Sequence, residues 1–177
     1  MRALFAVALF LSSRLISLAQ EAPLVSPLSS FTISQQQNDG WTTALHFAHA
    51  AHRDVSLEGK YPWPALFYIS PDDRWILQIQ KSGSGDNISF LYRVEQNGRV
   101  WRMGQGFGEL AFQFLDRLPG LHRAEMYHTG IEFRAWSMRD GSLRFTIHGS
   151  SVEQSGKGVE RELIYDLKNH QFRTPKA

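Results

Sequence analysis

The chain contains no cysteine among its 177 residues. This absence excludes disulfide bonds, thiolate metal ligands, a thiol nucleophile and a lipid-modified cysteine. The sequence also has no run of five or more basic residues, which would be the electrostatic footprint of a nucleic-acid binder. A G-x-S-x-G nucleophile elbow is missing as well. We therefore expect a protein stabilised by packing alone, with no nucleic-acid partner, no cofactor and no metal.

No apolar run reaches the roughly 20 residues that a membrane span needs. The run Ala3 to Leu11 instead follows Arg2 and precedes Ser17-Leu18-Ala19, the small-x-small pattern that signal peptidase recognises. We predict that residues 1–19 are a signal peptide and that the protein is periplasmic or secreted. An N-terminal membrane anchor is the alternative, but Arg14 interrupts the run.

Cleavage at this position would change the charge of the protein. It removes Arg2 and Arg14 and no acid, so Lys+Arg falls from 19 to 17 against 17 Asp+Glu, and the formal net charge falls from +2 to 0. The basic pI of the precursor is thus no sign of an anionic partner. After cleavage we expect no membrane insertion, and the remaining 158 of 177 residues suit one domain.

The first part of the remaining chain mixes loop and helix signals. Residues 20–30 are rich in Pro and Ser and predict a disordered lead-in. Phe31 to Ile33 predicts a short strand, and the Ala-rich segment Trp41 to His52 predicts a helix of about three turns. We expect residues 31–177 to form a single α+β domain.

From Ala65 onward the apolar residues alternate with a period of two. Short β-branched or aromatic segments alternate with turn residues, and the links are too short for parallel connections, which predicts an antiparallel meander. The predicted strands are Ala65 to Ile69, Trp75 to Gln80, Ile88 to Glu95 and Val100 to Met103. Asn97-Gly98 predicts a two-residue type I′ turn that would place Val94 opposite Trp101.

The last third of the chain predicts a helix followed by more strands. Gly108 to Leu118 has the four-residue apolar spacing of an amphipathic helix. The strands that follow are Ile131 to Met138, Leu143 to His148, Val159 to Asp166 and, less clearly, Gln171 to Arg173. A three-residue loop, Arg139 to Gly141, would join the first two of them with Gly141 in a left-handed conformation. The fold class is therefore α+β, mainly an antiparallel β meander of about seven to eight strands with one or two short helices.

One motif in the meander carries a family resemblance. Ser70-Pro71-Asp72-Asp73-Arg74-Trp75-Ile76 resembles the S-P-D-G-x-x-[ILV] motif that begins a strand in TolB-type and WD40-like β-propeller blades. The resemblance covers about Ala65 to Met103, which is roughly one blade, and Asp73 stands where the family usually has Gly. It implies a four-stranded blade of the kind that serves as a protein-binding platform. The two aspartates are expected to stabilise the turn.

Three histidines, His46, His49 and His52, stand at regular spacing. On one helix the outer pair would be turned apart by about 120°, so the three imidazoles would not meet one ion, and the His-Glu-x-x-His pattern of zinc proteases is absent. We interpret them as a solvated edge, with no metal site and no assigned catalytic residue.

One sheet face is the candidate binding site. If the strands after Ile131 alternate regularly, polar and aromatic side chains gather on the face that points away from the core, and an exposed Trp beside Arg is typical of a binding hot spot. A helix over Glu109 to Leu118 covering this face is the alternative. The candidate residues are Glu132, Arg134, Trp136, Arg144, Thr146 and His148.

The absence of catalytic motifs favours a non-catalytic, exported binding module that recognises a protein or cell-envelope component through this face. The alternative is a small periplasmic or secreted hydrolase or metal-dependent enzyme that uses histidines from residues 46–52 together with His128 or His148. A structural part of an envelope assembly is a third hypothesis, which predicts an unpaired edge strand or a large apolar patch.

Overall fold

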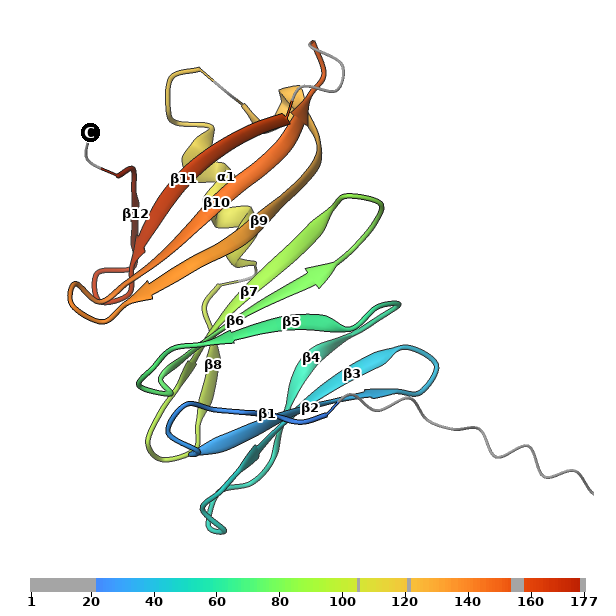
Figure 1. The fold of residues 1–177 in the computed structure, drawn as a ribbon, viewed down its shortest axis with the longest axis vertical. Helices are drawn as coiled ribbons and strands as arrows, with labels where there is room; N and C mark the ends of the chain where they lie inside the picture. The colour runs from blue at the N-terminus through green and yellow to red at the C-terminus, as the bar shows by residue number, and fades with distance from the viewer. Residues whose placement is uncertain (1–21, 105, 121, 154–157, 176–177) are drawn as a thin grey trace, which may run out of the picture.

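The computed structural model describes residues 22–104, 106–120, 122–153 and 158–175, and the predicted signal peptide lies outside them. In these residues the chain forms three antiparallel sheets of four strands each, and the strand order in each sheet follows the chain (Figure 1). The predicted α+β class with seven to eight strands is therefore wrong. The described chain has twelve strands and one α-helix, and the fold is nearly all β.

The first sheet replaces the predicted helix at residues 41–52. It consists of β1 (Leu24–Val25), β2 (Phe31–Gln37), β3 (Trp41–Phe47) and β4 (Val55–Tyr61). In β3, Thr43 and Leu45 are buried and alternate with more exposed residues, so a period of two overrides the helix propensity of the alanines. Residues 24–30, expected to be a disordered lead-in, supply β1 and the turn that joins it to β2.

The second sheet confirms the predicted meander. It consists of β5 (Ala65–Ile69), β6 (Trp75–Lys81), β7 (Asn87–Val94) and β8 (Val100–Arg102). The predicted type I′ turn is wrong, because the Glu95 N–H donates to the Arg99 carbonyl and Val94 lies opposite Val100. The loop therefore has three residues, with Gly98 in the left-handed region at φ 79°. Trp101 consequently pairs with Arg93.

The third sheet contains the remaining strands. It consists of β9 (Met126–Ser137), β10 (Ser142–Ser151), β11 (Gly158–Asp166) and β12 (Gln171–Arg173). The predicted helix is present as α1 (Phe107–Leu115), and a short 3-10 helix (Arg123–Glu125) leads into β9. Gly141 has φ 60° as expected, but Ser137 pairs with Ser142, so the β9–β10 loop has four residues.

The second sheet lies between the first and the third (Figure 1). Its side chains contribute to two separate cores, one on each of its faces. Ile76 and Tyr92 pack toward the first sheet, against Phe31 and Leu45. Leu77 and Leu91 point to the opposite side and join the core that the third sheet forms with α1. The second sheet therefore holds the other two in position, as expected for strands that are apolar on both faces.

Side-chain amides join each sheet to the next. Gln35 of β2 pairs with both backbone groups of Ala65, accepting from its N–H at 2.7 Å and donating to its carbonyl at 3.0 Å. Asn87 of β7 does the same with Ile131 of β9, at 3.0 and 3.1 Å. Each amide thus satisfies backbone groups at a sheet junction as a neighbouring strand would.

Among the described residues, no helix is long and apolar enough to span a bilayer.

Candidate functional site

The predicted binding face is open to solvent, but its members are tied to one another. The alternative that α1 covers it is wrong, because α1 packs against the core side of the sheet through Phe107 and Phe112. Arg134 donates to the Thr146 hydroxyl at 2.7 Å and to Glu132 at 3.1 Å. The Arg134 guanidinium covers Thr146, which is buried, whereas Glu132 and Arg134 themselves are exposed. The charges of this face are therefore largely compensated.

Trp136 does not belong to this face. A bulge in β9 shifts the register between Arg144 and Phe145, so that Trp136 lies opposite Leu143. Its ring packs on Phe133, with the ring centroids 5.9 Å apart, and it lies half-buried against the core. Its Nε1 is buried without a hydrogen-bond partner among the described residues. The predicted exposed Trp hot spot is therefore absent.

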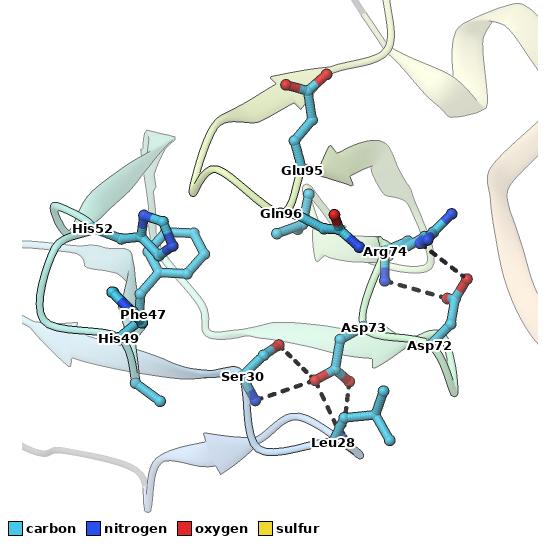
Figure 2. A pocket seen from close by; sticks show the side chains of 12 residues that line it. Leu28, Ser30, Phe47, His49, His52, Asp72, Asp73, Arg74, Glu95 and Gln96 are labelled. Atoms are coloured by element: carbon cyan, nitrogen blue, oxygen red, sulfur yellow. Dashed lines mark hydrogen bonds and ion pairs between the residues drawn. The ribbon is translucent and has the colours of Figure 1, made fainter.

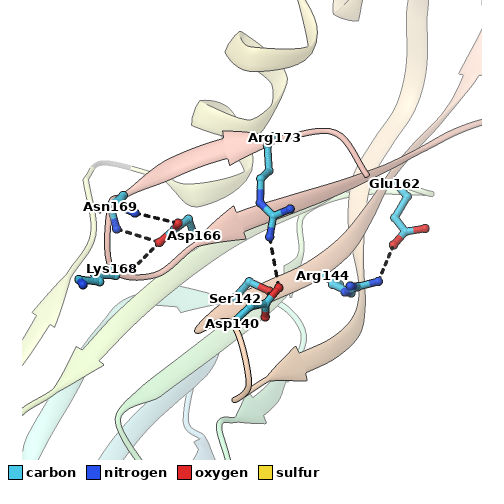
Figure 3. Close-up of polar contacts among 8 residues, drawn as sticks. All are labelled: Asp140, Ser142, Arg144, Glu162, Asp166, Lys168, Asn169 and Arg173. Atoms are coloured by element: carbon cyan, nitrogen blue, oxygen red, sulfur yellow. Dashed lines mark hydrogen bonds and ion pairs between the residues drawn. The ribbon is translucent and has the colours of Figure 1, made fainter. Parts of the chain in front are cut away.

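The two other members of the predicted set lie at the ends of the face. Arg144 is exposed and lies 4.0 Å from Glu162 of β11 (Figure 3). His148 lies at the far end, half-buried, with its Nε2 3.4 Å from the Asn87 amide at the junction with the second sheet. Three exposed residues, Glu132, Arg134 and Arg144, therefore remain on this surface, Thr146 is buried beneath Arg134, and His148 belongs to a structural contact.

A second polar cluster lies at the hairpin end of this sheet (Figure 3). Hydrogen bonds from the Ser137 and Ser142 hydroxyls lower the pKa of Asp140, and Arg173 lies 3.2 Å from that carboxylate. Asp166 accepts hydrogen bonds from Asn169 and from the Lys168 N–H, which lower its pKa. The Asp166 contacts lie within one turn, and Arg173 joins β12 to the β9–β10 loop, so these contacts stabilise the hairpin ends of the sheet.

The histidines of residues 46–52 separate into two environments. His46 lies on β3, on the face of the first sheet that points away from the second sheet. Its Nε2 is 2.7 Å from the Ser34 hydroxyl and its Nδ1 is 2.7 Å from the Asp54 carboxylate. This is the Ser-His-acid connectivity in which a carboxylate orients an imidazole that accepts the hydroxyl proton. The side chains of His46 and Asp54 are 43% and 62% exposed, so solvent weakens their ion pair.

His49 and His52 line a cleft between the first and second sheets (Figure 2). We call this the inter-sheet cleft. It has a volume of about 610 Å³, apolar walls that include Leu28, Phe47 and Val94, and a polar rim of His49, His52, Arg74 and Glu95. The two imidazoles lie 5.1 Å apart, and His52 contacts the Phe47 ring at 5.4 Å edge to face.

Asp73 closes one end of this cleft (Figure 2). Its carboxylate, only 6% exposed, accepts hydrogen bonds from the Ser26 hydroxyl at 2.7 Å, from the Ser30 hydroxyl at 2.6 Å and from the Leu28 and Ser30 N–H groups at 3.2 Å. Burial alone would raise the pKa of Asp73, but these hydrogen bonds outweigh it, so the pKa is lowered. Its left-handed backbone, φ 56°, explains why Gly is common at this position of the resembling motif.

The cleft gathers two histidines and carboxylates without forming a reactive pair. The Asp73 carboxylate is occupied by the β1–β2 turn, and Asp72 accepts from the Ser70 hydroxyl at 2.6 Å and from the Arg74 N–H. No group of three potential metal ligands occurs in the described residues. His128 and His148 belong to the third sheet, on the far side of the second sheet from His46, so the predicted combination of these histidines is not assembled.

A scan against protein-family models finds no match for this chain, and a search of curated proteins finds no similar sequence. The resemblance of residues 65–103 to a propeller blade therefore stays a prediction.

Proposed function

We propose that the protein is an exported, non-catalytic binding module that recognises a protein or cell-envelope component through the inter-sheet cleft. The cleft itself carries this proposal. It is a concave, mainly apolar site with a few converging polar groups, which is the usual form of a recognition site, and its volume of about 610 Å³ is enough for an apolar side chain of a partner. The propeller-blade resemblance of the adjoining turn, with its protein-binding role, agrees with it.

The chemistry of the cleft indicates the partner. Phe47 and Val94 would contact an apolar or aromatic side chain, and His49, Arg74 and Glu95 on the rim would hydrogen-bond to the flanking backbone. Because the rim carries charges of both signs, we expect affinity to depend weakly on salt. The open face with Arg134 and Arg144 is the second surface to be tested, since its charges are exposed but already paired with glutamates.

The two surfaces can be separated with the full-length protein as bait in an envelope extract. His49→Glu changes the rim of the cleft, and Arg144→Glu, which introduces the same side chain, is the control on the sheet face. We expect His49→Glu to reduce capture of the specific partner at least tenfold and Arg144→Glu to leave it unchanged. If only Arg144→Glu loses capture, the binding site lies on the sheet face. If the wild type and both variants capture the partner equally, both assignments are refuted.

A hydrolase is the second candidate, because one observation favours it. Two hydrogen bonds join the side chains of Ser34, His46 and Asp54, and they involve the same atoms as in a serine-hydrolase catalytic triad. Ser34 Oγ would attack an ester carbonyl, its proton would pass to His46 Nε2 and then to the leaving alcohol, and water would release the acyl group. We rank this second because solvent screens the His46–Asp54 pair.

Covalent labelling tests the hydrolase directly. A fluorophosphonate probe on the intact protein should modify Ser34 if His46 activates it. His46→Gln should abolish this modification, whereas Ser56→Ala, on the neighbouring strand, should leave it unchanged. If the probe leaves Ser34 unmodified, or labels the His46→Gln variant equally, the hydrogen-bonded chain is structural.

A further inference from the structure

A second cavity lies where the start of β7 meets the N-terminus of α1. β8 pairs only with Tyr92 to Val94, so the first half of β7 has no neighbouring strand on that side. The cavity there has a volume of about 300 Å³, which is at the lower end of the range for ligand pockets. Residues of β7, α1 and β9 all line it.

Ser89 places an unpartnered hydroxyl at this cavity. The residue is 2% exposed, and its Oγ has no hydrogen-bond partner among the described residues. It lies against Gly108 in the first turn of α1, where a Cβ would come within 2.7 Å of it. A buried hydroxyl without a partner is costly, so its retention beside a cavity indicates a ligand that completes its hydrogen bonds.

The beginning of α1 supplies the charge preference of the site. The N-cap residue Gly106 makes no side-chain capping hydrogen bond, so the first-turn N–H groups are not satisfied by a cap. These N–H groups and the helix dipole together favour an anion. The cavity lining includes Gly106, whose lack of a side chain lets a ligand approach the backbone closely.

The charged residues at the cavity compensate one another. Arg123 donates to the Glu109 carboxylate, and its guanidinium lies 4.9 Å above the Phe112 ring. The pair leaves no net charge, so the polarity of the site is set by Ser89 and the helix N-terminus. The rest of the lining is apolar and includes Ile88, which is 39% exposed, with Phe90 and Ile131.

We propose that this cavity binds a small carboxylic acid with an apolar chain, whose carboxylate accepts hydrogen bonds from Ser89 Oγ and the first-turn N–H groups of α1 while its chain contacts Ile88, Phe112 and Ile131. A carboxylate suits both donors, because it offers several acceptor sites. The limited volume restricts the acid to a short chain or to the C-terminal residue of a peptide.

Calorimetric titration of the full-length protein tests this site. Hexanoate should bind, and hexanamide, which has the same chain without the charge, should bind at least tenfold more weakly. Ser89→Ala should weaken hexanoate binding about tenfold, as expected for a lost hydrogen bond to a charged group. It should raise the melting temperature of the ligand-free protein, because it removes a buried hydroxyl that has no partner there. Glu109→Gln should strengthen hexanoate binding by removing a nearby negative charge.

A control and a second ligand complete the experiment. Gln113→Ala, on the exposed part of α1, should bind hexanoate like the wild type. A short apolar peptide with a free C-terminal carboxylate that binds more tightly than its amidated form would support the site and assign the acid to a chain terminus. Equal binding of hexanoate and hexanamide, unchanged binding by Ser89→Ala, or no binding of either the acid or the peptide would overturn the proposal.

Discussion

Asp73 offers the sharpest test of how the first two sheets are joined. Its carboxylate accepts from two hydroxyls and two backbone N–H groups of the turn between Ser26 and Ser30. Asp73→Asn keeps the shape and tolerates the left-handed backbone, which separates the loss of hydrogen bonds from backbone strain. The amide oxygen can serve only part of the four donors, and its NH₂ group would face the others.

The expected magnitude follows from these contacts. A hydrogen bond to a charged group contributes about 1.5–3 kcal/mol, and bonds to one carboxylate are not additive. We therefore expect Asp73→Asn to lower the free energy of unfolding by about 3 kcal/mol. At roughly 2–4 °C per kcal/mol for a chain of this size, the melting temperature should fall by about 6–12 °C. Urea denaturation should show a lower midpoint with an unchanged slope.

Asp72→Asn is the matched control, because Asp72 lies in the same turn but bonds only to Ser70 and Arg74. We expect it to cost less than about 1 kcal/mol. If Asp73→Asn lowers the free energy of unfolding no more than Asp72→Asn does, the view that the Asp73 carboxylate joins the two sheets is refuted.

The pH dependence provides an independent check. The folded pKa of Asp73 lies below its usual value of 3.8, so its contribution to stability is present above that pH and is lost as the pH falls through the folded pKa. The stability gap between wild type and Asp73→Asn should therefore be constant near neutral pH and shrink in acid. A gap that stays the same down to pH values well below 3.8 would show that the charge of Asp73 does not matter.

Two further predictions concern other parts of the fold. Asn87→Ala should lower the free energy of unfolding by about 1–3 kcal/mol, because the Ile131 N–H and carbonyl lose their partner at the second sheet junction. Chemical denaturation measures this change. An unchanged free energy of unfolding would mean that solvent satisfies both backbone groups. Burial, and then the charge of Asp166, raise the pKa of Tyr165 above 10.0, so its contribution to stability is complete below about pH 10 and is lost as the pH rises toward the folded value. Ultraviolet titration should show a tyrosine that ionises above its ordinary range, and Tyr165→Phe should remove that step.

The strands of the second and third sheets were predictable because their apolar residues alternate cleanly. β5 and β12 have the predicted bounds, and α1 begins within one residue of its predicted start. Trp41 to His52 was misassigned because its alanines and Leu45 fit a helix as well as a strand. Only the pairing of β3 with two neighbouring strands decides between these patterns.

The candidate sites depended on details of pairing that local sequence does not contain. A single bulge in β9 moved Trp136 from the polar face to the core side. Ser34 and His46 meet because a tight turn at Asn38 to Gly40 places β2 against β3 in one register. The turn residues Asn-Asp-Gly were the available signal for that hairpin. The contact between Ser89 and Gly108 joins a strand to a helix and left no pattern in the sequence.

The two outermost faces of the three sheets share a polar character. Thr32 and His46 cover the outside of the first sheet, and Arg134 and Arg144 cover the outside of the third. An apolar outer face would attract a further sheet, either from this chain or from another molecule. These side chains therefore limit the layering to three sheets, and exchanging Thr32 and His46 for valine should favour end-to-end association of the protein.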